Sequence, residues 1–262
     1  MTVRAFVREK LADFRARAVL PTSPRHDDLY LVEFPKSGVT WLSYLMANTG
    51  LALGGQARRA TFFNLNELVA DIHFDRNLAP PRADGFGFRC IKSHAGFTAQ
   101  YKRVFYLVRD PRAVMASYFT FATELGQWGG SFDEFVRHPQ FGIEAWIRHV
   151  NGWVDNIDEG LSFAPVRYED LLADTAGALR ILYRLLGFEL EDVAIARVIA
   201  QSSIERMRED EALFNAGHLR LKGFSFVRKE KAGGARVAMP DVVKAYIERE
   251  AGATMRRLGY EI

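Results

Sequence analysis

Short apolar runs that end in polar residues constrain the fold of this chain more than any other feature. Residues 29–34, 87–91 and 104–108 form three such runs, and each has a length typical of a buried strand. Helical spacing follows the first run over residues 41–47 and the third run over residues 111–123. Strands that alternate with helices predict an α/β fold, in which a mostly parallel central sheet is flanked by helices on both faces.

Further elements follow from the same patterns. Residues 162–168 are a fourth candidate strand, although Pro165 is unusual inside a sheet. Residues 1–20 have the spacing of an amphipathic helix, and residues 51–86 are expected to be an insertion of loops and short helices. Residues 215–238 are expected to form a loop. Additional helices are expected over residues 141–158, 173–187, 190–209 and 240–258.

Length, charge and cysteine content narrow the class of protein. A chain of 262 residues that is 48% apolar fits one domain, so residues 1–262 are expected to form a single unit. The formal net charge of +3 is too small to indicate a nucleic-acid-binding protein. The single cysteine, Cys90, excludes a disulfide framework and a cysteine-based metal cluster. The sequence has no targeting segment and no apolar run that could span a membrane, so we expect a soluble, cytoplasmic protein.

The segment after the first strand has the features of an anion-binding loop. Residues 35–41 (PKSGVTW) lie between a strand and a helix, where backbone N–H groups can bind a phosphate. Lys36 adds a positive charge and Thr40 adds a hydroxyl group. The glycine pattern of a Walker A loop is missing, which disfavours a nucleoside triphosphatase. A tight turn with an exposed lysine is the alternative interpretation of this segment.

The same segment resembles the 5′-phosphosulfate-binding loop of cytosolic-type sulfotransferases, whose usual form is PKSGTTW. Arg109 and Ser117 match a second signature of that family, in which a serine follows an arginine at a fixed distance. Lys92-Ser93-His94 is similar to the family's K-T-H segment. The matches keep the family's order and cover nearly the whole chain. Weaker similarities lie at residues 167–170 (RYED), 202–207 (SSIERM), 226–233 (FVRKEKAG) and 255–260 (MRRLGY), the last of which resembles bacterial members.

This resemblance implies a P-loop-kinase-like sulfotransferase fold and a defined reaction. A sulfuryl group would move from 3′-phosphoadenosine-5′-phosphosulfate to a hydroxyl or amine of a small-molecule acceptor. The donor is polyanionic and would need two anion sites, one at the loop and one at Arg109, whose planar fork suits a phosphate. The implied donor-binding residues are Lys36, Ser37, Gly38, Val39, Thr40 and Trp41 in the loop, with Arg109, Ser117, Tyr168, Ser202, Ile204, Arg228 and Lys229 elsewhere.

The resemblance also implies three catalytic residues. His94 would be the general base, since an unperturbed imidazole titrates near neutral pH. Lys36 and Lys92 would stabilise the negative charge that develops, and Lys36 would also donate a proton to the leaving oxygen. The reaction needs no metal. His26 and His73, each close to aspartates in the sequence, are expected to be solvated loop residues rather than metal ligands.

Several positions depart from the family's usual pattern. Val39 replaces a threonine of the loop, and Ile204 stands where an aromatic residue often covers the adenine. Glu230 replaces a glycine and brings a negative charge to the predicted donor-binding loop, residues 215–238, where Lys231 lies beside it. A non-catalytic phosphoadenosine-binding relative and a nucleotide-dependent kinase therefore stand as alternatives to a sulfotransferase.

The acceptor site is much less defined by the sequence. Residues 51–86 and 123–131 are candidate acceptor-site loops. We expect a small-molecule acceptor as the partner, with no nucleic acid and no membrane, and leave a homodimer open. A set of aromatic residues near the catalytic segments forms either an apolar acceptor pocket or part of the core: Phe62, Phe63, Phe74, Phe97, Tyr101, Phe119, Phe121 and Trp128.

Overall fold

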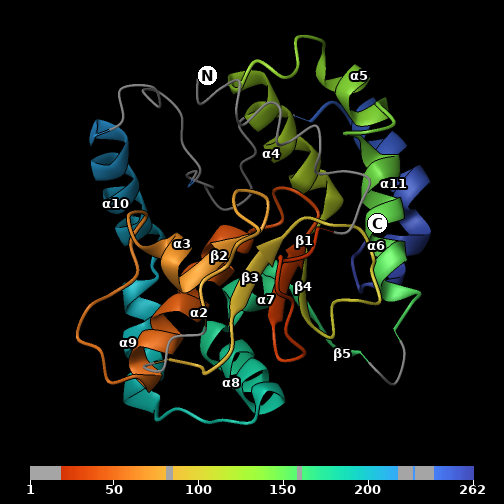
Figure 1. Cartoon of the computed structure of the whole chain (residues 1–262). Helices are drawn as coiled ribbons and strands as arrows, with labels where there is room; N and C mark the ends of the chain where they lie inside the picture. The colour runs from red at the N-terminus through yellow and green to blue at the C-terminus, as the bar shows by residue number, and fades with distance from the viewer. Residues whose placement is uncertain (1–18, 81–84, 158–160, 218–226, 228–238) are drawn as a thin grey trace.

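A five-stranded sheet forms the centre of the computed structural model (Figure 1). All its neighbouring strands are parallel, which confirms the predicted α/β fold. The helix predicted over residues 1–20 falls almost wholly outside the described part of the chain. The structure describes residues 19–80, 85–157, 161–217, 227 and 239–262. The strands are β1 (Leu29–Glu33), β2 (Val69–Asp71), β3 (Cys90–Ser93), β4 (Arg103–Val108) and β5 (Ser162–Arg167), in the spatial order β2-β3-β1-β4-β5.

Helices cover both faces of this sheet. Alternate strand residues point to opposite faces, so Leu29 and Leu31 pack against α2, α7, α8 and α9, whereas Tyr30 and Val32 pack with α4, α5, α6 and α11. Within the described ranges, no helix combines the length and apolarity that a membrane span requires. The helices are α2 (Val39–Leu53), α3 (Leu65–Leu68), α4 (Pro111–Glu124), α5 (Phe132–Arg137), α6 (Ile143–Val154), α7 (Tyr168–Ala173), α8 (Thr175–Leu186), α9 (Asp192–Gln201), α10 (Ile204–Gly217) and α11 (Asp241–Arg257).

Residues that start a new helix explain two differences from the prediction. The helix predicted over residues 190–209 is divided into two, and the helix predicted over residues 173–187 is preceded by a separate short helix, α7. The helix predicted over residues 190–209 breaks before Ser203, whose hydroxyl accepts the Arg206 N–H at 3.3 Å. Asp174 separates α7 from α8, and its carboxylate accepts the Gly177 N–H at 2.8 Å. Such side chains satisfy N–H groups that a helix start leaves without a partner. Apolar periodicity alone does not register these interruptions.

The shortest elements also differ from the prediction. β2 lies inside the segment that was expected to hold only loops and short helices, and α5 follows directly after the second candidate acceptor loop. β3 starts three residues later than the predicted 87–91 strand, because Gly87 is in a turn with a φ of 74°. Pro165 lies within β5, where it pairs with Tyr106. β5 is an edge strand, and a proline is accepted there because one side of the strand has no ladder hydrogen bonds to lose.

The order of the strands brings three polar segments together. β1 lies between β3 and β4, and Leu31 is level with both Lys92 and Phe105. Parallel strands in this register end at the same edge of the sheet. The segments that follow β1, β3 and β4 therefore lie side by side, at the edge where open parallel sheets bind ligands.

A buried ion pair ties the opposite edge of the same strands together. Arg89, just before β3, donates to both carboxylate oxygens of Asp28, just before β1, at 2.7 and 2.6 Å. The Asp28 side chain is fully buried, and the Arg89 side chain is 7% exposed. Arg89 also donates to the Ser23 carbonyl oxygen at 2.7 Å. Both charges are thus compensated by direct contacts rather than by water.

We predict that Arg89→Ala lowers the free energy of unfolding by about 3–5 kcal/mol, because it leaves the Asp28 carboxylate buried without its counter-charge. Urea unfolding followed by circular dichroism measures this loss. Arg180→Ala is the matched control, since it removes an exposed pair with Asp192 and is expected to cost about 0–1 kcal/mol. Equal losses in the two variants would contradict the role given to the buried pair.

Candidate active site

The chain turns tightly between β1 and α2. Lys36 has a φ of 76° and Gly38 a φ of 111°, so both are in the left-handed region. Ser37 closes the turn, because its N–H and its hydroxyl both donate to the Phe34 carbonyl oxygen, at 3.2 and 2.9 Å. α2 begins at Val39, so the first N–H groups of the helix face this loop.

Gly38 is also required by a close contact. A Cβ atom at this position would lie 2.6 Å from Cδ2 of Tyr168, the first residue of α7. Even without the strain of a positive φ, no larger residue fits here unless the tyrosine ring moves. The loop and α7 are therefore packed directly against each other.

A cavity of about 110 Å³ opens beside this loop. The segments that form its wall are far apart in the sequence. They include the end of β1 with the loop and first turn of α2, the β4–α4 junction with part of α4, α7 and α10. Most of the residues predicted to bind the donor thus lie around one space. They are Lys36, Gly38, Val39, Thr40, Trp41, Arg109, Ser117, Tyr168 and Ile204, and the wall also includes Glu33, Met207 and Val227.

Aromatic contacts hold the arginine of this wall. The Arg109 guanidinium lies over the ring of Tyr168, with Cζ 4.4 Å from the ring centroid. Trp41 packs edge-on against the same ring, at a centroid distance of 5.8 Å. Arg109 is only 8% exposed, so its charge is directed to the cavity rather than to bulk water.

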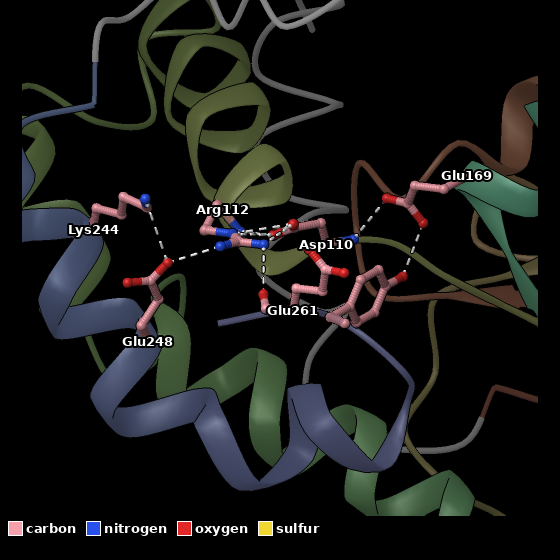
Figure 2. Close-up of polar contacts among 7 residues, drawn as sticks. Asp110, Arg112, Glu169, Lys244, Glu248 and Glu261 are labelled. Carbon is pink, nitrogen blue, oxygen red and sulfur yellow. Dashed lines mark hydrogen bonds and ion pairs between the residues drawn. The ribbon is translucent and has the colours of Figure 1, made fainter.

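A polar network fixes the start of α4, the helix that carries Ser117 (Figure 2). Asp110 caps this helix by accepting the Arg112 N–H at 2.8 Å. Arg112 in turn donates to Glu248 of α11 at 2.7 Å, and the Asp110 N–H donates to Glu169 of α7 at 3.0 Å. Three helices are thereby joined at one point, which positions the β4–α4 side of the cavity.

Lys92 and His94 lie at the end of β3, next to the last residue of β1. Lys92 Nζ is 3.0 Å from Oδ2 of Asp71, the last residue of β2. His94 Nδ1 is 3.6 Å from Oε1 of Glu33, and the His94 N–H donates to Nε2 of His73 at 2.9 Å. Glu33 lines the cavity, so it lies between that space and the two predicted catalytic residues, Lys92 and His94.

The His94 imidazole is held in its neutral form. Burial is the main cause that lowers its pKa well below the usual range, and the charges of Lys92, His73 and His149 act in the same direction. His149 is itself neutral at neutral pH, because burial lowers its pKa to about 4. Its Nε2 donates to the His94 carbonyl oxygen at 3.2 Å, and its Nδ1 accepts from the Tyr106 hydroxyl at 2.8 Å. A neutral imidazole is able to accept a proton.

Glu33 is a site residue that the sequence analysis missed. Its carboxylate accepts the Val39 N–H at 2.7 Å and the Lys36 N–H at 3.2 Å. The residue is 3% exposed, and burial raises its pKa to about 7 despite these hydrogen bonds and the nearby lysines. The available signal was an acidic residue that ends an otherwise apolar strand directly before the loop.

The comparison with known proteins identifies the family. The family model described as "Sulfotransferase domain" matches residues 26–259. The chain belongs to the sulfotransferase family. The predicted enzyme class is confirmed by this match. The sulfotransferase is 26% identical over 245 residues to mouse sulfotransferase 2A1, which covers 87% of this chain and 78% of the relative. It is 24% identical over 227 residues to rat sulfotransferase 2A2, with coverage of 78% and 76%.

Solved structures share the fold of this sulfotransferase. Mouse sulfotransferase SULT7A1, crystallised with PAP, superposes with a TM-score of 0.65 at 19% identity, covering 95% of this chain and 89% of that one. Retinol dehydratase, crystallised with androsterone and the inactive cofactor PAP, gives a TM-score of 0.67 at 20% identity and covers 95% and 85%. At these identities the similarity establishes the shared architecture.

Two of the predicted donor-binding serines, Ser37 and Ser202, are not among the residues that line the cavity of the sulfotransferase. Ser37 and Ser202 are both fully buried. The Ser202 hydroxyl accepts from Asn48 at 3.0 Å, and its carbonyl oxygen accepts from the Trp41 indole at 3.1 Å. Both serines therefore support the wall through hydrogen bonds to other protein groups. Arg228, Lys229 and Glu230 lie outside the described residues.

The candidate acceptor aromatics are mostly packed in the core. Tyr101 is fully buried and stacks on Tyr30 at a centroid distance of 3.6 Å. Phe121 is 7% exposed, and the Lys36 ammonium lies 4.3 Å from its ring centroid. Phe63 is 60% exposed. Phe62, Phe97, Phe119 and Trp128 pack against the two core clusters, and Phe74 is exposed.

Part of the predicted acceptor segment lines a second cavity. This space of about 250 Å³ lies beside α2 and is bordered by residues of the 51–86 segment, Phe86 among them, and by Phe88. Asp71, the partner of Lys92, also lines it. None of the eight aromatic residues singled out from the sequence lines either of these two cavities.

The expectation of solvated loop residues near His26 and His73 is wrong in part. His73 is 7% exposed and packs 5.7 Å from the His94 ring, and Asp28 is buried against Arg89. The polar ends of this sheet are thus more deeply enclosed than the sequence indicates. Among the described residues, no three His, Cys, Asp or Glu side chains are placed to hold a metal ion.

We predict that Gly38→Ala destabilises the protein more than Gly187→Ala does. Both positions have a positive φ, of 111° and 82°, but an added Cβ meets nothing within 4 Å at Gly187. The control should therefore cost about 1–2 kcal/mol from backbone strain alone, whereas Gly38→Ala adds the collision with Tyr168. Urea unfolding measures both losses, and adding Tyr168→Ala should recover part of the larger one. Equal losses, or no recovery, would contradict the contact.

Proposed function

We propose that this sulfotransferase moves a sulfuryl group from 3′-phosphoadenosine-5′-phosphosulfate to a hydroxyl or amine of a small-molecule acceptor, with His94 as the general base. In this reaction the acceptor atom forms a bond to sulfur while the bond from sulfur to the 5′-phosphate oxygen breaks. The acceptor proton passes to His94, and 3′-phosphoadenosine 5′-phosphate (PAP) leaves. The bound PAP in the two structural neighbours supports this choice of donor.

One observation carries the donor assignment. A single cavity is lined by Lys36 of the β1–α2 loop and Thr40 of the first turn of α2, and also by Arg109, between β4 and α4, and Ser117 of α4. A doubly phosphorylated adenosine needs two separate groups of donors and positive charges. The loop supplies backbone N–H groups and an ammonium for the 5′-phosphosulfate, and Arg109 supplies a planar fork for the 3′-phosphate.

The proposed chemistry follows from the charges at the end of β3. His94 is neutral over the physiological range, so it is able to accept the acceptor proton. Lys36 and Lys92 would stabilise the charge on the transferred group and on the phosphate oxygen that departs, and Lys36 would protonate that oxygen. Asp71 holds Lys92 through the 3.0 Å ion pair, which limits where its ammonium lies.

The acceptor loops are also proposals. Residues of the 51–86 segment border the cavity of about 250 Å³, and one of them is Asp71, the ion-pair partner of Lys92. An acceptor held in this cavity would therefore approach Lys92 and His94 from the side of β2. Residues 123–131 begin in the last turn of α4, the helix that carries Ser117, and continue beyond it. A relative that only binds phosphoadenosine would keep the donor cavity yet give no sulfuryl transfer, and a transfer assay distinguishes it.

We predict that PAP binds more tightly than ADP, and that Arg109→Ala lowers the affinity for PAP by about 10–100-fold, the value of a hydrogen bond to a charged group. The affinity for ADP, which lacks a 3′-phosphate, should change little. Isothermal titration calorimetry measures the four dissociation constants, and Arg180→Ala serves as a surface control. Equal affinity for the two nucleotides would remove the case for a dedicated 3′-phosphate site.

We predict that His94→Ala abolishes sulfuryl transfer while PAP still binds. The assay follows labelled sulfate from the donor to acceptors found in a screen of phenols, sugars and amines. His26→Ala, which alters an exposed histidine, should keep wild-type activity. Normal turnover in His94→Ala would disprove the assigned base.

The pH profile gives an independent check of the base. Because the pKa of His94 is lowered, the imidazole stays deprotonated as the pH falls through 6.5, the ordinary pKa of a histidine side chain. At saturating donor, we predict that kcat keeps its neutral-pH value down to below pH 6.5. A loss of half the activity at or above pH 6.5 would contradict the neutral, buried histidine.

A further inference from the structure

The donor cavity contains an acidic side chain where an anionic ligand would be expected to exclude one. Of the described residues that line this cavity, Glu33 is the only acidic one, and Lys36 and Arg109 are the basic ones. The family signature that points to the donor begins two residues later, at Pro35, and gives Glu33 no role. The presence of Glu33 in the cavity wall therefore needs a separate explanation.

The Glu33 carboxylate occupies the groups that suit a phosphate. One oxygen accepts the Val39 N–H at 2.7 Å, and the other accepts the Lys36 N–H at 3.2 Å. Val39 is the first residue of α2, so its N–H belongs to the positive end of that helix. Glu33 thus places its own negative charge at the loop that would bind the 5′-phosphate of the donor.

The surroundings of Glu33 are balanced between its two protonation states. Lys36 in the loop and Lys92 on β3 favour the ionised form, as does the Val39 N–H of α2. Burial opposes them and raises the pKa to about 7. His94 on β3 lies 3.6 Å away but is neutral, with His73 and His149 behind it, and the buried phenol of Tyr106 on β4 has a raised pKa.

An incoming phosphate changes this balance. A second anion within a few ångströms disfavours the ionised carboxylate, as it does in any pair of like charges in a site with little water. A protonated carboxyl group has an O–H to donate and an oxygen that still accepts. It would therefore keep the Val39 N–H and donate to a phosphate oxygen, so that no hydrogen-bonding group at the loop is lost.

We propose that Glu33 is part of the donor site and binds the 5′-phosphate as a neutral carboxylic acid, so that the empty protein takes up one proton when PAP binds. This inference rests on the proposed function, since it needs the nucleotide in the described cavity. Glu33 then makes donor binding dependent on pH. Above about pH 7, where the empty site holds an ionised Glu33, the affinity for PAP falls by up to tenfold per pH unit.

The test is calorimetric titration of PAP into the protein at pH 8, in buffers with different ionisation enthalpies. The dependence of the observed heat on the buffer gives the number of protons taken up. The wild-type protein should take up close to one proton more than Glu33→Gln. The phosphates of PAP titrate near pH 6, so they contribute little at pH 8, and the comparison of the two proteins cancels what remains.

The affinities give a second readout. Glu33→Gln should bind PAP with an affinity that hardly changes between pH 7 and pH 8.5, and at pH 8.5 about tenfold or more tightly than the wild-type protein does. Glu134→Gln, which alters an exposed carboxylate in the capping box of α5, is the matched control and should behave as wild type. The wild-type proton count and pH profile need no variant, so they test the proposal even if Glu33→Gln fails to fold.

The outcomes separate this inference from the donor assignment. PAP binding by the wild-type protein with the same proton count as Glu33→Gln, or without a decline above pH 7, overturns the role of Glu33 and leaves the donor site standing. Failure of both proteins to bind PAP overturns the donor site and this inference together. A proton taken up by the wild-type protein alone supports the proposal.

Discussion

The parallel pairing of β1 with β3 on one side and β4 on the other is the constraint on which the site depends. This register makes the three strands end at one edge of the sheet, so Glu33, Lys92 and Arg109 are brought near each other although the sequence separates them widely. The buried Asp28–Arg89 pair joins β1 and β3 at their other ends. The geometry of the site is thus a consequence of strand order before any side chain contributes.

Burial then determines what the polar groups at this edge are able to do. Enclosure keeps the His94 imidazole neutral and raises the pKa of Glu33 to about 7, so the same physical cause places an uncharged imidazole 3.6 Å from a carboxyl group that titrates near neutral pH. An exposed carboxyl group would stay ionised at neutral pH, and an exposed imidazole would already be partly protonated near pH 6.5, because water stabilises their charged forms. The aromatic rings of Tyr168 and Phe121 serve a related purpose, since they hold the cations of Arg109 and Lys36 without cancelling their charge.

The sequence predicts the architecture and most of the cavity wall, because those features depend on local patterns. Apolar runs predict the central strands, and the PKSGVTW segment with Arg109 and Ser117 predicts residues that line one cavity. Features that depend on three-dimensional neighbours are not predictable in this way. The three residues of β2 are too few to show the alternation of apolar and polar residues that marks a strand. The Ser202 hydroxyl is buried and accepts a hydrogen bond from Asn48, a residue distant in the sequence. The burial of His73 depends on its packing against His94, which follows β3. The sequence did not indicate Glu33, because its place in the site depends on the folded loop, which directs the Lys36 and Val39 N–H groups to its carboxylate.

The central claim is that one cavity holds both ends of a doubly phosphorylated adenosine. A crystal structure of the protein with PAP tests this most directly. We expect the 5′-phosphate at the loop of residues 36–40, within hydrogen-bond distance of Glu33, and the 3′-phosphate within hydrogen-bond distance of Arg109 and Ser117. Density for PAP elsewhere, or with its 3′-phosphate far from Arg109, would contradict it.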